Sequence, residues 1–154
     1  MKIYVASSWR NPHQPEAVRF LRSIGHAVYD FREPDGEGIP GGFQWEQIPS
    51  WQPWPPSAFR ACLQHPMAAA GHTRDMEALR DADACVLVLP CNRSAHTEFG
   101  FHLGRIECGY REFGSAIVYY PDGIEQQEPE LMYRDAKICS GGRELRAALD
   151  AVSV

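Results

Sequence analysis

An uninterrupted run of six apolar residues at positions 84–89, Ala-Cys-Val-Leu-Val-Leu, constrains the fold more than any other feature of the chain. Asp83 and Pro90 bound the run, so it has the length of a strand and is too short for a helix. Polar and apolar residues do not alternate within it, which is typical of a strand covered on both faces. The run therefore predicts a central strand of a parallel sheet with helices on either side.

Strand and helix patterns alternate along the rest of the chain. Asn11 and Pro12 follow a short β-rich run and are expected to open a helix as its N-cap and first residue, and Gly25 is expected to end it. Ser94 is expected to cap a second helix that continues to about residue 107. The remaining strands are predicted at 2–6, 27–31, 116–120 and, more weakly, 136–139, and the remaining helices at 57–63, 72–81 and 143–152.

This alternation predicts an α/β fold, a flavodoxin-like or Rossmann-like three-layer sandwich with a mostly parallel sheet of four to five strands. A chain of 154 residues fits one compact domain, which we expect to span residues 1–154. A segment at about 32–56 is rich in Gly, Pro and aromatic residues and has no clear period. Because long loops inside compact domains are usually functional or mobile, we expect this one to serve the site, for example as a lid.

Composition excludes several classes of function. The hydrophobic share of 44% contains no apolar window long enough to cross a bilayer, and the N-terminal strand pattern leaves no room for a secretory signal, so we expect a cytoplasmic protein. The formal charge is −5 and no Lys/Arg cluster is present, which favours a small nucleoside or nucleotide ligand over a nucleic-acid polymer. Neither the five scattered cysteines nor the six histidines show metal-ligand spacing, and no dinucleotide motif is present. We predict reduced thiols, no metal and no cofactor.

Two carboxylates are the strongest candidates for catalysis. In a parallel sheet, ligands bind outside the carboxyl ends of the strands, where the strand order reverses, and Glu98 follows the most buried strand there. A carboxylate in the first turns of a helix is held ionised by the helix dipole, which suits a nucleophile, although a solvent-facing glutamate is the alternative. If the preceding chain folds over the strand ends, Asp75 would face Glu98. Cleavage of a glycosidic bond requires two such carboxylates with separate roles.

Three further groups of residues have both a functional and a structural interpretation. The loop Ser7-Ser8-Trp9-Arg10-Asn11 offers hydroxyls, amides and a guanidinium to an anion, or it only caps the helix, and the two interpretations are equally supported. The aromatic residues Phe43, Trp45, Trp51 and Trp54 either stack on a nucleobase or form a satellite core under the loop. Cys91 begins a loop after a strand but lacks the arginine of a thiol phosphatase, since Thr97 stands in its place, so a structural thiol is favoured.

Several of these residues together resemble the nucleoside 2-deoxyribosyltransferase superfamily, including its deoxynucleoside 5′-monophosphate N-hydrolase branch. The resemblance rests on Tyr4-Val5-Ala6-Ser7-Ser8 in the first strand, on Asp75, on the Ala-Asp pair and apolar strand at 82–88, and on Glu98-Phe99-Gly100. It implies that Glu98 is the nucleophile that attacks C1′ of the sugar, that Tyr4 orients it, and that Asp75 is the assisting acid. The segment 129–132 is similar to one that reaches into a neighbouring subunit's site, which implies a homodimer or a larger homo-oligomer with Glu130 and Met132 near that site.

Departures from the family pattern concern the substrate. Asn92 stands six residues before Glu98, where transferases have Asp and nucleotide hydrolases have Ser, and Glu130 stands where transferases have Asn. The family also has a glycine pattern directly before the nucleophile, and this chain has the bulkier residues Ala95, His96 and Thr97 there. Substrate contacts are expected from Ser7, Ser8, Arg10, Asn92, Ser94, Phe43, Trp45 and Met132.

The resemblance implies cleavage or transfer at the N-glycosidic bond of a (deoxy)nucleoside or its 5′-monophosphate, through a covalent glycosyl intermediate on Glu98. Two alternatives remain open. One is hydrolysis of NAD or another ADP-ribosyl compound by the same glutamate, and the other is a module that binds a nucleotide without turning it over.

Overall fold

The computed structural model describes residues 1–48, 52, 54–110, 114–122 and 130–152. The chain forms two compact units. Unit 1 consists of Met1–Tyr29 and Leu79–Val154, and unit 2 of Asp30–Ala78. Unit 2 is therefore a single continuous insertion into the chain of unit 1. The assignment of 1–154 to a single domain stays a prediction.

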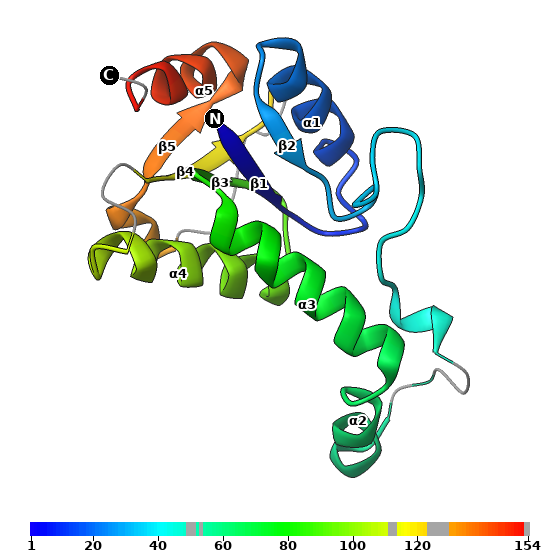
Figure 1. The fold of residues 1–154 in the computed structure, drawn as a ribbon. Coiled ribbons are helices and arrows are strands. Elements are labelled where there is room, and N and C mark those ends of the chain that lie inside the picture. Colours follow the sequence, from blue (N-terminus) through cyan, green and yellow to red (C-terminus); the bar gives the residue numbers. More distant parts are fainter. Residues whose placement is uncertain (49–51, 53, 111–113, 123–129, 153–154) are drawn as a thin grey trace. The chain divides into compact units, whose positions relative to one another are not determined.

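Unit 1 contains a five-stranded sheet in which every neighbouring pair is parallel (Figure 1). Its strands are β1 (Lys2–Ala6), β2 (Ala27–Tyr29), β3 (Ala84–Val88), β4 (Ser115–Tyr120) and β5 (Lys137–Ser140), in the order β2-β1-β3-β4-β5. This is the flavodoxin-like order, which reverses between β1 and β3. The predicted α/β fold and parallel sheet are confirmed, and the apolar run at 84–89 supplies the central strand.

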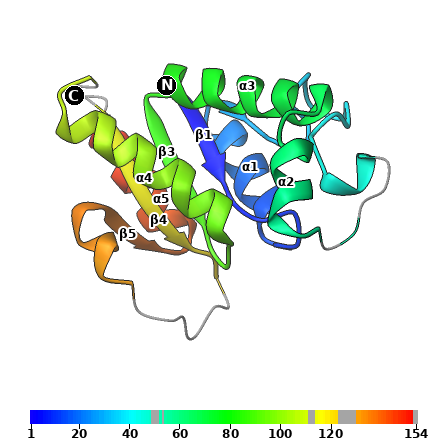
Figure 2. The ribbon, with the colours of Figure 1, turned by 90° about the horizontal axis from the view of Figure 1, so that it is seen from below.

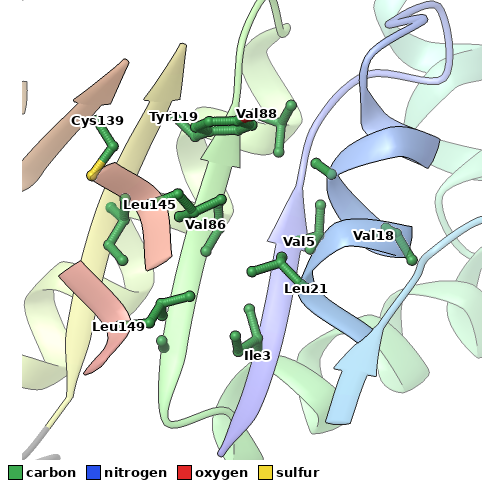
Figure 3. Packing of buried hydrophobic residues seen from close by; sticks show 13 residues of the cluster. Ile3, Val5, Val18, Leu21, Val86, Val88, Tyr119, Cys139, Leu145 and Leu149 are labelled. Carbon is green, nitrogen blue, oxygen red and sulfur yellow. The ribbon is translucent and has the colours of Figure 1, made fainter. Parts of the chain in front are cut away.

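Helices cover both faces of this sheet. On one face lie α1 (Gln14–Ser23) and α5 (Gly141–Asp150), and on the other lies α4 (Arg93–Glu107) (Figures 1 and 2). Figure 3 shows the core on the first face, where Leu21 of α1 and Leu145 of α5 pack over the inward side chains of β1 and β3. All five residues of β3 are buried, which explains why its sequence is apolar without alternation.

Three predicted helix starts are wrong. The helix predicted at 72–81 begins at Pro66, and the other two starts differ for reasons that lie in the tertiary structure. The first helix begins at Gln14, because Asn11 accepts a hydrogen bond from His13 N at 2.9 Å and uses its amide to bind the end of β3. The helix after β3 begins at Arg93 with Asn92 as its N-cap, so Ser94 lies inside the first turn and does not cap it.

Unit 2 contains a short 3₁₀ helix η1 (Trp45–Gln47), the helix α2 (Pro56–Cys62) and most of α3 (Pro66–Asp81). The aromatic residues of the long loop pack on one another and on α2. The Trp45 ring centroid lies 5.0 Å from that of Phe43, 6.0 Å from that of Trp54 and 5.5 Å from that of Phe59. This packing matches the satellite-core interpretation, while Trp51 lies outside the described residues.

The described helices include none with the length and apolarity needed to traverse a bilayer. The cytoplasmic location stays a prediction of the sequence.

Candidate functional site

The ends of β1 and β3 are joined by buried hydrogen bonds at the point where the strand order reverses. Ser7 Oγ donates to Val88 O at 2.9 Å, and Asn11 Nδ2 donates to the same carbonyl at 3.0 Å. Asn11 Nδ2 also lies 2.9 Å from Ser7 Oγ. Because Ser7 is only 8% exposed and its hydroxyl donates to β3, its role is to hold the two strand ends together.

The rest of the predicted anion loop lies closer to solvent. Ser8 Oγ accepts a hydrogen bond from Arg10 N at 3.2 Å, so this hydroxyl shapes the loop backbone. The Arg10 residue is exposed beyond it. Binding of a phosphate by this loop stays a prediction, and Arg10 is its best placed cation.

Tyr4 lies in the middle of β1 and is fully buried. Its neighbours in the sheet register are Tyr29 of β2 and Cys85 of β3, so all three side chains point to the same face. The Tyr4 and Tyr29 rings stack with centroids 5.3 Å apart and an interplanar angle of 18°. This face is opposite the one formed by Ile3 and Val5, which pack with α1 and α5, so Tyr4 faces the layer of α4.

Glu98 lies on the same side of the sheet as Tyr4. Burial first, and the Glu98 carboxylate second, raise the pKa of the buried Cys85 thiol, and the same two causes raise the pKa of Cys91 to about 12. The carboxylate is therefore within electrostatic reach of β3 at Cys85, directly beside Tyr4 on β1. The structure thus brings Tyr4 and Glu98 to one face of the β1–β3 junction.

The predicted reason for an ionised Glu98 needs revision. Glu98 is the sixth residue of α4, which places it in the second helical turn. The effect of the helix dipole falls off within the first turn, so the dipole adds little at this position. Glu98 is half-buried, and its surroundings in the fold, more than the helix end, determine its chemistry.

A pocket of about 760 Å³ lies along the flank of α4 that faces away from Glu98. Successive helical residues are turned by about 100°, so His96, Gly100 and Leu103 share one flank while Glu98 points nearly opposite to it. Two predicted substrate residues, Asn92 and Met132, line this pocket, and Glu98 does not. The pocket is lined by Cys91, Asn92, Arg93, His96, Phe99, Gly100, Leu103, Gly104, Glu107, Glu130, Met132, Tyr133 and Asp135.

Two residues that line this pocket form a hydrogen bond between α4 and a second 3₁₀ helix, η2 (Leu131–Asp135). His96 Nε2 lies 2.7 Å from Tyr133 Oη, and His96 Nδ1 lies 2.9 Å from Asn92 O. The His96 and Tyr133 rings are nearly parallel, with an interplanar angle of 5° and centroids 5.9 Å apart, and Phe99 packs edge-on against Tyr133. Burial raises the pKa of Tyr133, with smaller contributions from Cys91, Tyr120 and Glu130, so its hydroxyl keeps its proton.

Sequence reasoning missed this pair because nothing in the sequence links the two positions, which are 37 residues apart. Both ring nitrogens of His96 have partners, since Nδ1 also lies 3.6 Å from Cys91 Sγ. Ser94, another predicted contact, is exposed in the first turn of α4. The sequence signal that could have raised interest in Tyr133 is its place directly after the segment 129–132, which the resemblance had already singled out.

The predicted site residues of unit 2 are held by contacts of their own unit. Asp75 is half-buried on α3. Next to it, Arg74 pairs with Asp35 at 3.3 Å and donates to Gly41 O at 3.1 Å, which fastens the start of the long loop to α3. Phe43 packs so closely on Gly71 that a Cβ at that glycine would lie 2.7 Å from Phe43 Cβ.

Fold and site together define a flavodoxin-like α/β protein with a carboxylate at the reversal of its strand order. The chain is similar in structure to a 2-deoxyribosyltransferase from the psychrotolerant bacterium Bacillus psychrosaccharolyticus, with a TM-score of 0.51 and 19% sequence identity. The match covers 96% of this chain and 90% of the other. The resemblance to the nucleoside 2-deoxyribosyltransferase superfamily is thereby confirmed at the level of the fold. No family model matches the sequence, and no curated protein matches it.

Proposed function

We propose that this protein cleaves or transfers the N-glycosidic bond of a (deoxy)nucleoside or nucleoside 5′-monophosphate through a covalent glycosyl intermediate on Glu98. One observation carries the proposal: the Glu98 carboxylate is within electrostatic reach of Cys85, whose neighbour in the sheet is Tyr4, at the reversal between β1 and β3. This is where flavodoxin-like sheets bind their ligands. The structural neighbour supports the substrate class, because it is described as a biocatalyst for the synthesis of nucleosides.

The proposed reaction has two steps at the anomeric carbon. A Glu98 oxygen attacks C1′, the bond from C1′ to the base nitrogen breaks, and its electron pair leaves with the base. The departing base takes a proton from an acid, a role that the resemblance assigns to Asp75. Water then displaces Glu98 to complete hydrolysis, or the nitrogen of a second base displaces it to complete transfer.

The two thiols whose pKa the Glu98 carboxylate helps to raise favour this assignment of roles. Only a thiolate is a strong nucleophile, and the pKa of Cys91, at about 12, keeps its sulfur protonated near neutral pH. Cys85 is fully buried and its pKa is also raised. Neither sulfur therefore competes with the carboxylate for the sugar or adds a negative charge beside it.

Two copies of the chain are needed if the predicted residues act on one substrate. Met132 lines the pocket on one flank of α4, and Glu98 lies on the other flank. A substrate held by Glu98 would then meet Met132 of a second copy, as the resemblance implies for the segment at 129–132. Glu130 and Met132 are exposed, as such a role requires, and Pro129 lies outside the described residues. A homodimer or a larger homo-oligomer is therefore part of the proposal.

The test is a mass-spectrometric assay for free base over a panel of ribo- and deoxynucleosides and their 5′-monophosphates, with and without an acceptor base. A 2-fluoro sugar substrate should leave a glycosyl adduct on the peptide that contains Glu98. The proposal is sunk if no member of the panel is cleaved and no adduct forms. Release of nicotinamide from NAD would support the ADP-ribosyl alternative, and a nucleotide that binds but is recovered intact would support a binding module.

A further inference from the structure

The short helix η2 presents two apolar side chains to solvent immediately before a buried one. Leu131 is 80% exposed and Met132 is 65% exposed, whereas Tyr133 is only 6% exposed. Tyr133 is therefore the side chain among these three that packs η2 against the rest of unit 1, where Phe99 of α4 lies edge-on to its ring. The Tyr133 hydroxyl lies 2.7 Å from Nε2 of His96 on α4.

The hydrogen bonds of His96 determine where its proton lies. A backbone carbonyl only accepts, so at 2.9 Å from Asn92 O the ring must carry its proton on Nδ1. Nε2 of the neutral ring is then an acceptor and receives the Tyr133 hydroxyl proton at 2.7 Å. Because its pKa is raised, Tyr133 remains a phenol that can donate. His96 Nδ1 also lies 3.6 Å from Cys91 Sγ, which can accept weakly from the same proton, so donor and acceptor match at both ends of the ring.

The same ring also fixes the start of the helix that carries Glu98. Asn92 O accepts from His96 Nδ1 and, at 3.3 Å, from His96 N. Asn92 is the N-cap of α4, and its side chain makes no capping hydrogen bond there. The His96 ring therefore contacts both the first turn of α4, at Asn92 O, and η2, at Tyr133 Oη. Through these two contacts it helps to fix the positions of Asn92 and Met132.

We propose that His96 is a positioning residue, and that its hydrogen bond to Tyr133 holds η2 in the pose in which Met132 is presented to the active site of a second copy. This inference rests on the proposed function for its catalytic consequence. The anchor itself, formed by His96 and Tyr133, is a structural claim that can be tested without any activity.

The first experiment is nitrogen-15 NMR of the histidine side chains at a pH where the imidazoles are neutral. We expect His96 to carry its proton on Nδ1 in the unmodified protein and to gain the Nε2-protonated form in Tyr133→Phe. The methyl resonance of Met132 should shift in Tyr133→Phe and remain in place in Tyr110→Phe, which removes a phenol that is 76% exposed. Protonation of His96 on Nε2 in the unmodified protein, or an unchanged Met132 methyl, would overturn the anchor.

The second experiment measures base release. Tyr133→Phe should lower kcat/KM by about tenfold or more, because misplacement of a positioning element by about 1 Å has effects of that size, while Tyr110→Phe should not. Mixing Tyr133→Phe with Glu98→Gln should restore activity in trans, since each hybrid dimer has one site with Glu98 from one copy and an anchored η2 from the other. Random pairing would give about a quarter of the unmodified activity.

The two experiments separate the failure of the inference from that of the proposed function. An inactive unmodified protein rejects the proposed function, and the NMR experiment still decides whether the anchor exists. An active protein whose Tyr133→Phe variant is fully active, or whose mixture with Glu98→Gln only averages the two activities, rejects the positioning role and leaves the proposed function in place.

Discussion

Ser7 Oγ lies 2.9 Å from Val88 O, and this contact joins two strands whose residues are 81 positions apart in the chain. Asn11 binds the same carbonyl at 3.0 Å. Both contacts are buried, and together they close the carboxyl ends of β1 and β3 where the ligand is expected. The loop at 7–11 was predicted as an anion site, but its buried residues Ser7 and Asn11 serve to join the two strand ends.

Asn11→Ala should lower the free energy of unfolding by about 2 kcal/mol, because it removes a donor from the buried Val88 carbonyl and a local bond to His13 N. Urea unfolding followed by circular dichroism measures this. Ser8→Ala is the matched control, since it removes one hydrogen bond, to Arg10 N, at a less buried position and should cost about 0.5 kcal/mol. Equal effects of the two substitutions would show that the junction does not stabilise the fold.

Glu98→Gln should reduce base release by about a thousandfold or more, because a neutral amide cannot form the glycosyl ester. Asp150→Asn removes an exposed carboxylate on α5 and should leave the rate unchanged. Both proteins should keep the circular dichroism spectrum of the unmodified chain. A Glu98→Gln protein with more than a tenth of the original rate would exclude the covalent mechanism.

The reactivity of Cys91 should depend on Glu98. Burial is the larger cause of its raised pKa and the carboxylate the smaller, so Glu98→Gln should lower the pKa from about 12 without returning it to the ordinary value near 9. The thiolate fraction at a given alkaline pH then rises, and alkylation by iodoacetamide becomes faster. Peptide mass spectrometry across a pH series measures this at Cys91, with the exposed Cys108 as an internal reference. An unchanged pH midpoint would mean that Glu98 does not lie near the thiol.

Asp75→Asn should slow cleavage most for bases that need a proton in order to leave. A nucleoside of 7-methylguanine releases its base without protonation, so its rate should fall much less than that of guanosine or deoxyguanosine. Comparing kcat/KM for the two substrate types tests the assignment of Asp75 as the acid. A uniform loss over both substrate types would assign Asp75 to binding instead.

Gly71→Ala should destabilise unit 2 by about 1–3 kcal/mol, because the new methyl group would lie 2.7 Å from Phe43 Cβ and force the aromatic cluster to shift. Tryptophan fluorescence during urea unfolding reports on it through Trp45 and Trp54. Gly104→Ala in α4 is the control, since nothing lies within 4 Å of its added Cβ. That change should be neutral or stabilising by up to about 1 kcal/mol. Similar losses in both variants would contradict the close packing at Gly71.

The sheet could be predicted from the sequence because the burial of β3 on both faces is visible as an apolar run. The start of the first helix could not be predicted in this way. Asn11 is a residue type that favours N-cap positions, but its side-chain amide donates to Val88 O on a distant strand. The early start of α3 at Pro66 was missed although Pro at the first position and three consecutive alanines signal it. Here the information was present in the sequence.

The positions of the candidate site residues were predictable where they depend on strand ends and not where they depend on side-chain partners. Glu98 and Tyr4 follow from the positions of β3 and β1, and the structure places them on one face. The separation of Asn92 and Met132 from Glu98 depends on the rotation of α4, and the pairing of His96 with Tyr133 depends on how the chain returns from β4. Neither leaves a local pattern in the sequence.

The order of the strands also affects how the chain folds during synthesis. β1 is made first, yet one of its edges pairs with β3, so that edge has no partner until residue 84 and the following strand residues have emerged. While unit 2 is being translated, the segment formed by β1, α1 and β2 has already emerged, and the β1 edge that will pair with β3 is still unpaired. At roughly 5–20 residues per second that interval is several seconds, and during it a nascent chain is open to aggregation or to the binding of a chaperone.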